Sequence, residues 1–596
     1  MTARTLIGLL AATAACPALA AEPPVAEARL APGAAVPSQL DAAQRDGYRA
    51  VFAAIREQRW QDAQLQLDTI RPGPLHAIAL AELYTAKGSP RVELEPLVAV
   101  LVQAPELPQA EALARLATAR GATELPPLPA TRTLIWQDGA PTRVRAKATK
   151  GDLIAADLAI AMQPFVKVDD GQSAEALLDA TPGLTPEALT EWRQRVAWMY
   201  YLAGRDADAG RVAALGANGI GDWAVQARWV GALAAWRLHD YAAAAAGFEG
   251  VAARAGDVDL RAAALYWVAR ADMAGGRPDR IEARLKAAAQ WDESFYGQLS
   301  RQALGLRDGA KVRTGLVPAD WAALDRRPNI RVAAALVEID ETELADKVVR
   351  QQARIGEPGE FAALARLTEA LDLPATTFWL AHNRPAGAAT LTAARFPTPS
   401  WKPASGWRVD RALVFAHTLQ ESSFRSKVVS PAGAYGLMQI MPAAATDFAR
   451  ERGLPEVDRT ALTRPSVNMD VGQRHLERLR DMTVTTGGLL PKVIAAYNAG
   501  AKPVGEWNAI VRDGGDPLLY IESIPYWETR GYVTTVLRNY WVYEGRTGKP
   551  QSVSRSALAQ GLWPRFPGLP GAAMVRLNAR PSPVATAGLA ASTGTD

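Results

Sequence analysis

Helix-forming residues fill the chain from about Asp41 to about Arg384. Runs rich in alanine, leucine, arginine and glutamate alternate there with breaks at glycine or proline, a pattern typical of short helices joined by turns. Four runs share one arrangement, in which an aromatic-bearing helix, a polar turn and an alanine-rich helix follow one another. They begin at Val51, Ala197, Ala234 and Leu265. Such units cannot bury their apolar faces alone, so the pattern predicts a stack of helix hairpins, an α-superhelix.

Three tryptophans mark this loose repeat. Trp198, Trp236 and Trp267 recur at intervals of 38 and 31 residues, close to the roughly 34 residues of a helix-hairpin repeat. Aromatic side chains at helical spacing are usually core residues, so we expect these three to wedge the hairpins together rather than to stack on sugars. The spacing does not predict whether the superhelix closes into a ring.

A proline-rich break divides the chain into two blocks. The stretch from Arg384 to Trp407 contains four prolines, which exclude a continuous helix. After it, short apolar helices alternate with connections of glycine, proline and asparagine, and no run of residues alternates as a strand would. Both blocks therefore predict helices, and we expect an all-α fold.

The first twenty residues have the pattern of an export signal. One arginine precedes a short apolar run, and Ala18-Leu19-Ala20 provides a cleavage site. We therefore expect residues 1–20 to be a signal peptide and the mature chain to be periplasmic. Cys16, the only cysteine, lies in this segment; its lipid modification, which would anchor the chain to the outer membrane, is the alternative. No later stretch approaches the roughly 18 apolar residues of a membrane span.

Composition narrows the classes of function. The 596 residues are 49% hydrophobic and 21% charged, enough for several packed domains. Lysine and arginine number 66 against 62 aspartates and glutamates, so electrostatics give no case for a nucleic-acid partner. No two of the five histidines have the spacing of zinc ligands, and the chain predicts neither a metal site nor a cofactor.

One carboxylate has a setting that suits acid catalysis. The run VDRALVFAHTLQESSF predicts a helix that is buried on most sides and ends near Glu421. A carboxylate there faces the negative end of the helix and an apolar wall, and both raise its pKa. A carboxyl group that stays protonated near neutral pH can donate a proton to a glycosidic oxygen. From Glu421 and Ser422 alone, an exposed glutamate without a role would be the simpler interpretation.

Three downstream segments make a catalytic role the better interpretation. They are SPAGAYGLMQIM at 430–441, AAYNAG at 495–500 and IESIPYWETRGYV at 521–533. The first offers glycines for close backbone approach, the amide of Gln439 and the adaptable apolar side chain of Met441. The second ends a helix on a phenol and an amide, and the third restarts a helix after a proline.

Four motifs in this order resemble the catalytic domain of the soluble lytic transglycosylases, relatives of goose-type lysozyme in glycoside hydrolase family 23. They are Glu421-Ser422, Gly436-Leu437-Met438-Gln439, Ala496-Tyr497-Asn498-Ala499-Gly500 and Ile524-Pro525-Tyr526-Trp527-Glu528-Thr529-Arg530. Upstream, ESFYGQL from Glu293 and RFPTPSW from Arg395 resemble the large subgroup that carries a superhelix and a linker domain. The sequence departs from the family's usual alanine, arginine and glutamine at Thr418-Leu419-Gln420, and it has an insert around residues 511–523.

This resemblance implies an order of domains and a set of site residues. We expect an α-superhelical domain at 21–320, a short helical linker domain at 321–400, a lysozyme-like catalytic domain at 401–550 and a partly disordered C-terminal extension at 551–596. Glu421 matches the catalytic acid and base. The residues that match saccharide contacts or line the groove are Ser430, Gln439, Met441, Tyr497, Asn498 and Glu528. Among them, Tyr497 matches the residue whose hydroxyl lies near the acid, and Glu528 a second groove carboxylate.

A single acid has a consequence for the reaction. Most glycosidases use two flanking carboxylates, but Asp447, the next along the chain, lies a helix away from Glu421. N-acetylmuramic acid can instead help through its own acetamido oxygen and its own 6-hydroxyl. We therefore expect a murein lytic transglycosylase that cleaves the β-1,4 bond between N-acetylmuramic acid and N-acetylglucosamine in peptidoglycan and forms 1,6-anhydro-N-acetylmuramic acid.

Two other functions remain as alternatives. One is a hydrolytic muramidase on the same fold, and the other is a non-catalytic, wall-binding helical scaffold. The expected partner is the glycan strand of peptidoglycan. No motif identifies a protein partner. Binding to the machineries of cell-wall synthesis or secretion is therefore left open.

Overall fold

The computed structural model describes residues 36–306, 315–451, 453, 457–549 and 551–578. The expected signal peptide with Cys16 and residues 579–596 lie outside this part of the chain. Within it, 28 α-helices dominate, which confirms the expected all-α class. Two short antiparallel strand pairs, which the sequence pattern did not predict, join β1 (Leu134–Trp136) to β2 (Asn383–Pro385) and β3 (Trp563–Pro564) to β4 (Met574–Val575).

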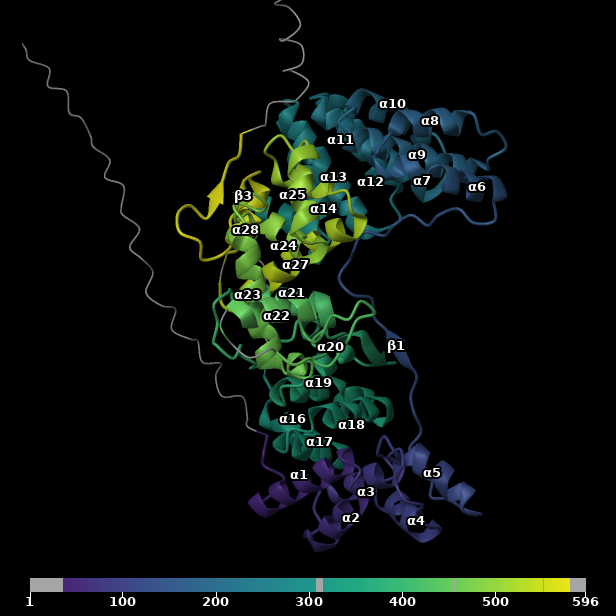
Figure 1. Ribbon diagram of the computed structural model, residues 1–596, viewed down its shortest axis with the longest axis vertical. Helices are drawn as coiled ribbons and strands as arrows, with labels where there is room; N and C mark the ends of the chain where they lie inside the picture. The colour runs from purple at the N-terminus through teal and green to yellow at the C-terminus, as the bar shows by residue number, and fades with distance from the viewer. Residues whose placement is uncertain (1–35, 307–314, 452, 454–456, 550, 579–596) are drawn as a thin grey trace, which may run out of the picture.

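Ten helices form a first lobe at one end of the elongated molecule (Figure 1). It combines the start of the chain with a much later segment around one buried apolar cluster. Its helices are α1 (Ala42–Arg56), α2 (Trp60–Thr69), α3 (His76–Thr85), α4 (Leu94–Gln103), α5 (Ala110–Ala119), α16 (Pro318–Leu324), α17 (Pro328–Glu338), α18 (Thr342–Ile355), α19 (Phe361–Ala370) and α20 (Pro374–His382). The expected division near residue 320 stays a prediction, and this core runs across it.

Ten further helices form a helical stack, in which each helix from α9 to α14 packs on the next. They are α6 (Leu153–Ala161), α7 (Gln163–Lys167), α8 (Gly171–Asp179), α9 (Pro186–Leu202), α10 (Asp206–Ala217), α11 (Gly221–Arg237), α12 (Tyr241–Arg254), α13 (Val258–Ala274), α14 (Ile281–Ala289) and α15 (Phe295–Ala303). Trp236 meets the fully buried Trp267 edge to face, with ring centroids 5.2 Å apart. These contacts join α11 to α13, as a wedging role requires.

The remaining helices form a C-terminal block, which shares one buried apolar cluster with the stack. They are α21 (Arg411–Ser422), α22 (Pro442–Glu451), α23 (Pro465–Asp481), α24 (Leu490–Ala499), α25 (Ala501–Ile510), α26 (Pro517–Glu522), α27 (Trp527–Arg546) and α28 (Val553–Ala559). Helix α27 packs on both α21 and α24. The buried side chain of Trp563 fixes the chain beyond residue 550 to this block.

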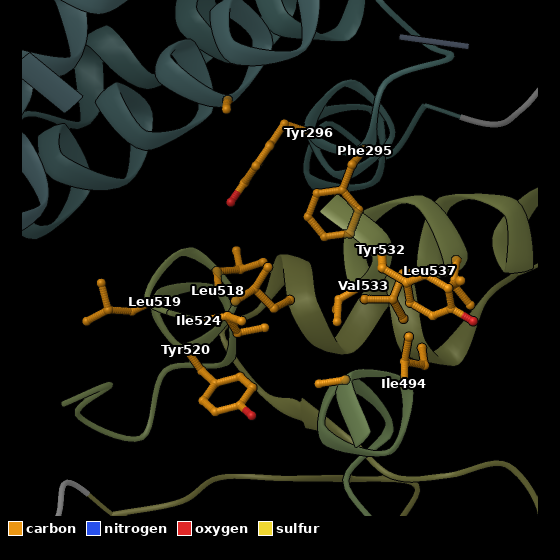
Figure 2. Close-up of a cluster of buried hydrophobic side chains, with 14 of the residues drawn as sticks. Phe295, Tyr296, Ile494, Leu518, Leu519, Tyr520, Ile524, Tyr532, Val533 and Leu537 are labelled. Carbon is orange, nitrogen blue, oxygen red and sulfur yellow. The ribbon is translucent and has the colours of Figure 1, made fainter. Parts of the chain in front are cut away.

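Helix α15 joins the stack to the C-terminal block. Phe295, which is 1% exposed, stacks on Trp541 of α27 with ring centroids 5.1 Å apart. Figure 2 shows Phe295 over the helix that carries Tyr532 and Leu537, with Tyr296 beside it. The stack therefore contacts the back of the helix that reaches the candidate site.

A long connection without helices runs from α5 in the first lobe to α6 in the stack (Figure 1). We call this segment, residues 120–152, the strap. It pairs with β2 through β1, and its Pro141 carbonyl accepts a hydrogen bond from Arg538 of α27 at 2.6 Å. It ends where the backbone N–H of Thr149 donates to Glu191 of α9 at 2.7 Å. The strap thus crosses the junction between the stack and the C-terminal block.

Candidate active site

The helix that carries Glu421 is α21, and its buried face explains its position. Its side chains from Ala412 to Leu419 are all buried, as the apolar run predicts. Asp410 caps the helix by accepting a hydrogen bond from the backbone N–H of Ala412 at 2.9 Å. At the other end, Ser423 and Phe424 both have left-handed backbone conformations, with φ of 51° and 63°. Two such non-glycine residues in succession are costly, and the turn they make leaves Glu421 at the helix end.

Glu421 is half-buried and has one hydrogen-bond donor from a side chain. The hydroxyl of Tyr532 donates to its Oε1 at 2.5 Å. Burial raises the pKa of Glu421 to about 7, the hydrogen bond from Tyr532 opposes this shift, and the negative charge of Glu528 adds to it. The carboxyl group is therefore divided between its protonated and ionised forms near neutral pH, as a group that both donates and accepts a proton requires.

Tyr532 is one of the site residues that the sequence did not assign. It lies in the motif region of α27, but its pairing with Glu421 depends on how two helices 111 residues apart in sequence meet. A tyrosine among several aromatic residues gives no signal of this in the sequence. Its own pKa is raised well above the usual value, first by burial and then by the charge of Glu421. It therefore stays a hydrogen-bond donor over the working pH range.

The loop from Val428 to Met441 forms a wall next to α21. Tyr435 pairs with both Val429 and Ile440 in short antiparallel bridges. Gly436 has a φ of 72°, and a Cβ atom there would collide with the carbonyl of Leu462 and with Asn468. The close approach explains the glycine of the Gly-Leu-Met-Gln motif.

Asn468 of α23 holds this wall from behind. It is fully buried, and its Oδ1 accepts the backbone N–H of Met438 at 2.8 Å. Its amide group donates to the carbonyls of Tyr435 and Leu462, each at 2.8 Å. Sequence reasoning did not single out Asn468, because its role depends on the fold of a loop 30 residues away.

The three predicted wall residues lie in this loop and differ in their hydrogen bonds and exposure. The hydroxyl of Ser430 accepts the N–H of Ala434 at 3.0 Å and closes a turn. Gln439, at a φ of 48°, donates its amide to the carbonyl of Gly436 at 3.0 Å. Met441 is 45% exposed, as an apolar surface for a ligand would be. The structure therefore brings the three residues into one loop, while their contacts with a saccharide stay predictions.

Tyr497 and Asn498 stand at the end of α24 and tie the site together. The Tyr497 hydroxyl donates to the carbonyl of Met438 at 2.8 Å, so it supports the wall loop, whereas the hydroxyl bonded to the acid is that of Tyr532. Tyr497 still interacts electrostatically with Glu421, whose charge helps to raise its pKa. Asn498 accepts a hydrogen bond from Thr529 of α27 at 2.6 Å.

A buried histidine packs under the acid. His417 lies one helical turn before Glu421, is fully buried, and has its ring centroid 4.8 Å from that of Tyr497. Its Nδ1 pairs with the carbonyl of Leu413 at 2.9 Å. Burial lowers its pKa to about 4, so the ring is neutral near pH 7 and adds no charge beside Glu421.

Glu528 is exposed on the first turn of α27 and borders a pocket of about 220 Å³. The pocket also has Gln420 and Tyr532 in its walls, and its far side consists of the strap around Thr142 and of Asp259 from the stack. Gln420, the neighbour of Glu421, lines this pocket, which lies at the junction of the C-terminal block with the stack and the strap. Asp447, by contrast, pairs with Arg450 and Arg478 at 3.3 and 3.2 Å on α22 and α23.

Two further observations concern the described residues alone. None of their histidine, cysteine or acidic side chains gather in a group of three or more that could hold a metal ion. None of their helices combines the length and the apolar character needed to cross a bilayer.

Comparison with known proteins gives a family match to part of the chain. Residues 399–518 match the Transglycosylase SLT domain. A soluble lytic murein transglycosylase from Salmonella typhimurium is 34% identical over 149 residues, and one from Escherichia coli is 37% identical over 134 residues. These matches cover 25% and 22% of this chain but only 23% and 20% of the relatives. The matched segment contains Glu421, and the chain spans less than a quarter of the length of these relatives.

Solved structures resemble nearly the whole chain. The 70 kDa soluble lytic transglycosylase of Escherichia coli superposes with a TM-score of 0.51 at 18% identity, covering 88% of this chain and 99% of that one. An inactive mutant of the lytic transglycosylase Slt from Pseudomonas aeruginosa gives a TM-score of 0.50 at 20% identity, covering 85% and 82%. At these identities the likeness shows a shared fold alone.

The raised pKa of Glu421 predicts a pH-dependent stability. Its pKa is higher in the folded chain, about 7, than the usual 4.5, so its contribution is fully present below about pH 4.5 and is lost as the pH rises through about 7. Glu421→Gln lacks this titration. Its free energy of unfolding relative to the parent should therefore rise between pH 4 and 8, by on the order of 3 kcal/mol.

Urea unfolding of both proteins across this pH range, followed by tryptophan fluorescence, measures the difference. Glu506→Gln serves as the control, because it removes a carboxylate that is 62% exposed on α25, and it should follow the parent. A difference between Glu421→Gln and the parent that stays constant over the range would contradict the burial of this carboxyl group.

Proposed function

We propose that this chain is a murein lytic transglycosylase that cleaves the β-1,4 bond between N-acetylmuramic acid and N-acetylglucosamine in peptidoglycan. The observation that carries this proposal is Glu421, a single half-buried carboxyl group with a pKa near 7 in an SLT domain. Relatives of this domain are named soluble lytic murein transglycosylases. One of the similar structures is a complex of the 70 kDa transglycosylase with bulgecin A.

The first step is proton donation. Protonated Glu421 gives its proton to the glycosidic oxygen as the bond from that oxygen to the anomeric carbon of N-acetylmuramic acid breaks, and the N-acetylglucosamine side leaves as an alcohol. The hydrogen bond from Tyr532 stabilises the carboxylate that forms. Positive charge on the anomeric carbon is met by the 2-acetamido oxygen of the same sugar, as in the substrate-assisted exceptions to the two-carboxylate rule.

The second step closes the product ring. The 6-hydroxyl of the same N-acetylmuramic acid attacks the anomeric carbon, and Glu421 takes up its proton, which restores the starting acid. No water enters and no cofactor is required. The nucleophile is already attached to the substrate, which gives it a large advantage in effective concentration over water. Asp447 forms surface ion pairs with Arg450 and Arg478, and we assign it no part in the reaction.

The surrounding residues support this chemistry in distinct ways. We assign Gln439, Met441 and Ser430 to the wall that holds the saccharide, and Glu528 to the groove beside it. Asn498 ties α24 to α27 through Thr529, which keeps the wall and Tyr532 in register. Export to the periplasm, where peptidoglycan lies, completes the proposal.

Replacing the acid tests the assignment. Glu421→Gln keeps the size of the side chain and removes the proton donor, so lysis of purified sacculi should fall by about two orders of magnitude or more. Turbidity of a sacculus suspension measures the rate, and Glu506→Gln should retain the parent rate. A folded Glu421→Gln protein that clears sacculi as fast as the parent would refute the role.

The pH profile of kcat/KM should show one limb that reports the ionisation of Glu421. The acid must be protonated in the free enzyme, so kcat/KM should decline as the pH rises through about 7. Initial rates on a soluble muropeptide oligomer between pH 5 and 9 provide the measurement. A rate that stays level up to pH 9 would show that another group, or a group with a higher pKa, donates the proton.

The product distinguishes a transglycosylase from a hydrolytic muramidase. Fragments should end in 1,6-anhydro-N-acetylmuramic acid, weigh one water less than hydrolytic fragments and resist borohydride reduction, because no reducing end is formed. Mass spectrometry of digests prepared in oxygen-18 water measures the fragment masses and shows whether oxygen from water has been incorporated. Reducible ends that carry oxygen-18 would establish the muramidase alternative, and intact sacculi with the folded parent protein would favour the non-catalytic scaffold.

A further inference from the structure

Arg143 of the strap places a positive charge at the junction of three parts of the molecule. Its side chain is 9% exposed, and its guanidinium lies 4.9 Å from the ring centroid of Trp229. Its Nε is 3.7 Å from the carboxylate of Asp259 on α13. Its two terminal nitrogens face Glu522, the last residue of α26. The strap, the stack and the C-terminal block therefore meet at this one side chain.

Glu522 depends on these partners because it is completely buried. Arg143 donates to its two oxygens from Nη1 at 2.5 Å and from Nη2 at 3.2 Å. The hydroxyl of Tyr296 on α15 donates to Oε1 at 2.6 Å. A buried carboxylate is tolerated only when its charge is paired and its oxygens are hydrogen-bonded. All three of these donor groups come from outside the C-terminal block.

The residues after Glu522 carry this fixation to the start of α27. Ser523 shares a hydrogen bond of 2.8 Å with Tyr201 of α9. Arg530 donates to the carbonyl of Ile524 at 2.8 Å while its guanidinium lies 4.4 Å from the ring centroid of Trp198. The segment 522–530 is thus clamped against the stack. Tyr532 follows two residues later in α27 and reaches Glu421.

Loss of Arg143 would remove the positive charge that holds segment 522–530 against the stack. Glu522 and Asp259 would both remain buried without their shared cation, and Arg530 is the guanidinium already attracted to Glu522. Re-pairing of Glu522 with Arg530 would draw Arg530 away from the carbonyl of Ile524, at the turn that starts α27. The block as a whole would stay docked, because Arg270 still pairs with Asp516 at 2.6 Å.

We propose that Arg143 is a positioning residue for the catalytic acid: through Glu522 it fixes the start of α27, and thereby the hydrogen bond from Tyr532 to Glu421. This inference rests on the proposed function and extends it, because it makes a residue of the strap, outside the SLT domain, part of what sets the proton affinity of Glu421. The other titratable groups that interact with Glu421 are Glu528 on α27 and Tyr497 on α24, and His417 on α21 packs against Tyr497.

The test compares pH profiles in the full-length chain. Tyr532→Phe removes the hydrogen bond that lowers the pKa of Glu421, so the alkaline limb of kcat/KM should move to higher pH. Arg143→Met should move the limb in the same direction and reduce the rate at the optimum about ten- to a hundredfold, the scale of a small misplacement of a catalytic group. In the double variant with Tyr532→Phe, Arg143→Met should cause no further shift.

Two variants complete the design. Arg145→Met makes the same change at an exposed position two residues along the strap, and it should leave both the rate and the limb unchanged. Arg143→Lys keeps the charge but cannot make the bidentate contact with Glu522. The alkaline limb of its pH profile should therefore lie between those of the parent and Arg143→Met. If Arg143→Met does not accumulate as folded protein, Glu522→Gln is judged by the same criterion.

The possible outcomes distinguish failure of this inference from failure of the proposed function. A lower rate with an unmoved limb, or a shift that adds in full to that of Tyr532→Phe, would mean that Arg143 only stabilises the fold, and the inference would be overturned. A parent protein that shows no lysis of sacculi would instead refute the proposed function and this extension with it. A parent limb near pH 7 that moves in Arg143→Met, as in Tyr532→Phe, supports the inference.

Discussion

The hydrogen bond from Tyr532 to Glu421 is the contact on which the site depends. Burial alone would favour the neutral form of the carboxyl group, and the charge of Glu528 acts in the same direction. The phenol at 2.5 Å opposes both, because it stabilises the ionised form. In the proposed mechanism, the resulting pKa near 7 lets one group serve as proton donor in the first step and as proton acceptor in the second. A site with a single carboxylate requires this balance.

Contacts far from Glu421 hold the Tyr532 hydroxyl in the position from which it balances the pKa of the acid. Helix α27 packs on α21 on one side and on α15 of the stack on the other. Phe295 presses on α27 at Trp541, and the buried pairing of Arg143 with Glu522 fixes the segment before it. The contacts of the helical stack therefore hold in place α27, the helix that carries Tyr532, one partner of this hydrogen bond.

Local signals in the sequence point to several residues of this candidate site, and their roles stay predictions. The apolar run before Glu421, the left-handed glycine of the Gly-Leu-Met-Gln turn and the phenol and amide that end α24 each leave a trace in neighbouring residues. The all-α class followed in the same way from helix-forming runs. What escaped prediction depends on contacts between distant segments. Tyr532 meets Glu421 across 111 residues, and Arg143 meets Glu522 across 379, and neither pairing leaves a local pattern.

The central claim is that Glu421 is a carboxylic acid that still carries its proton near neutral pH. Infrared difference spectroscopy between pH 6 and 8 can observe this directly, because the carbonyl band of a protonated carboxyl group disappears on ionisation. Glu544 also has a pKa raised to about 7 by burial, so the spectrum of Glu421→Gln must be subtracted to isolate Glu421. The account predicts a band that titrates near pH 7 in the parent and is missing from Glu421→Gln. Identical difference spectra for the two proteins would contradict it.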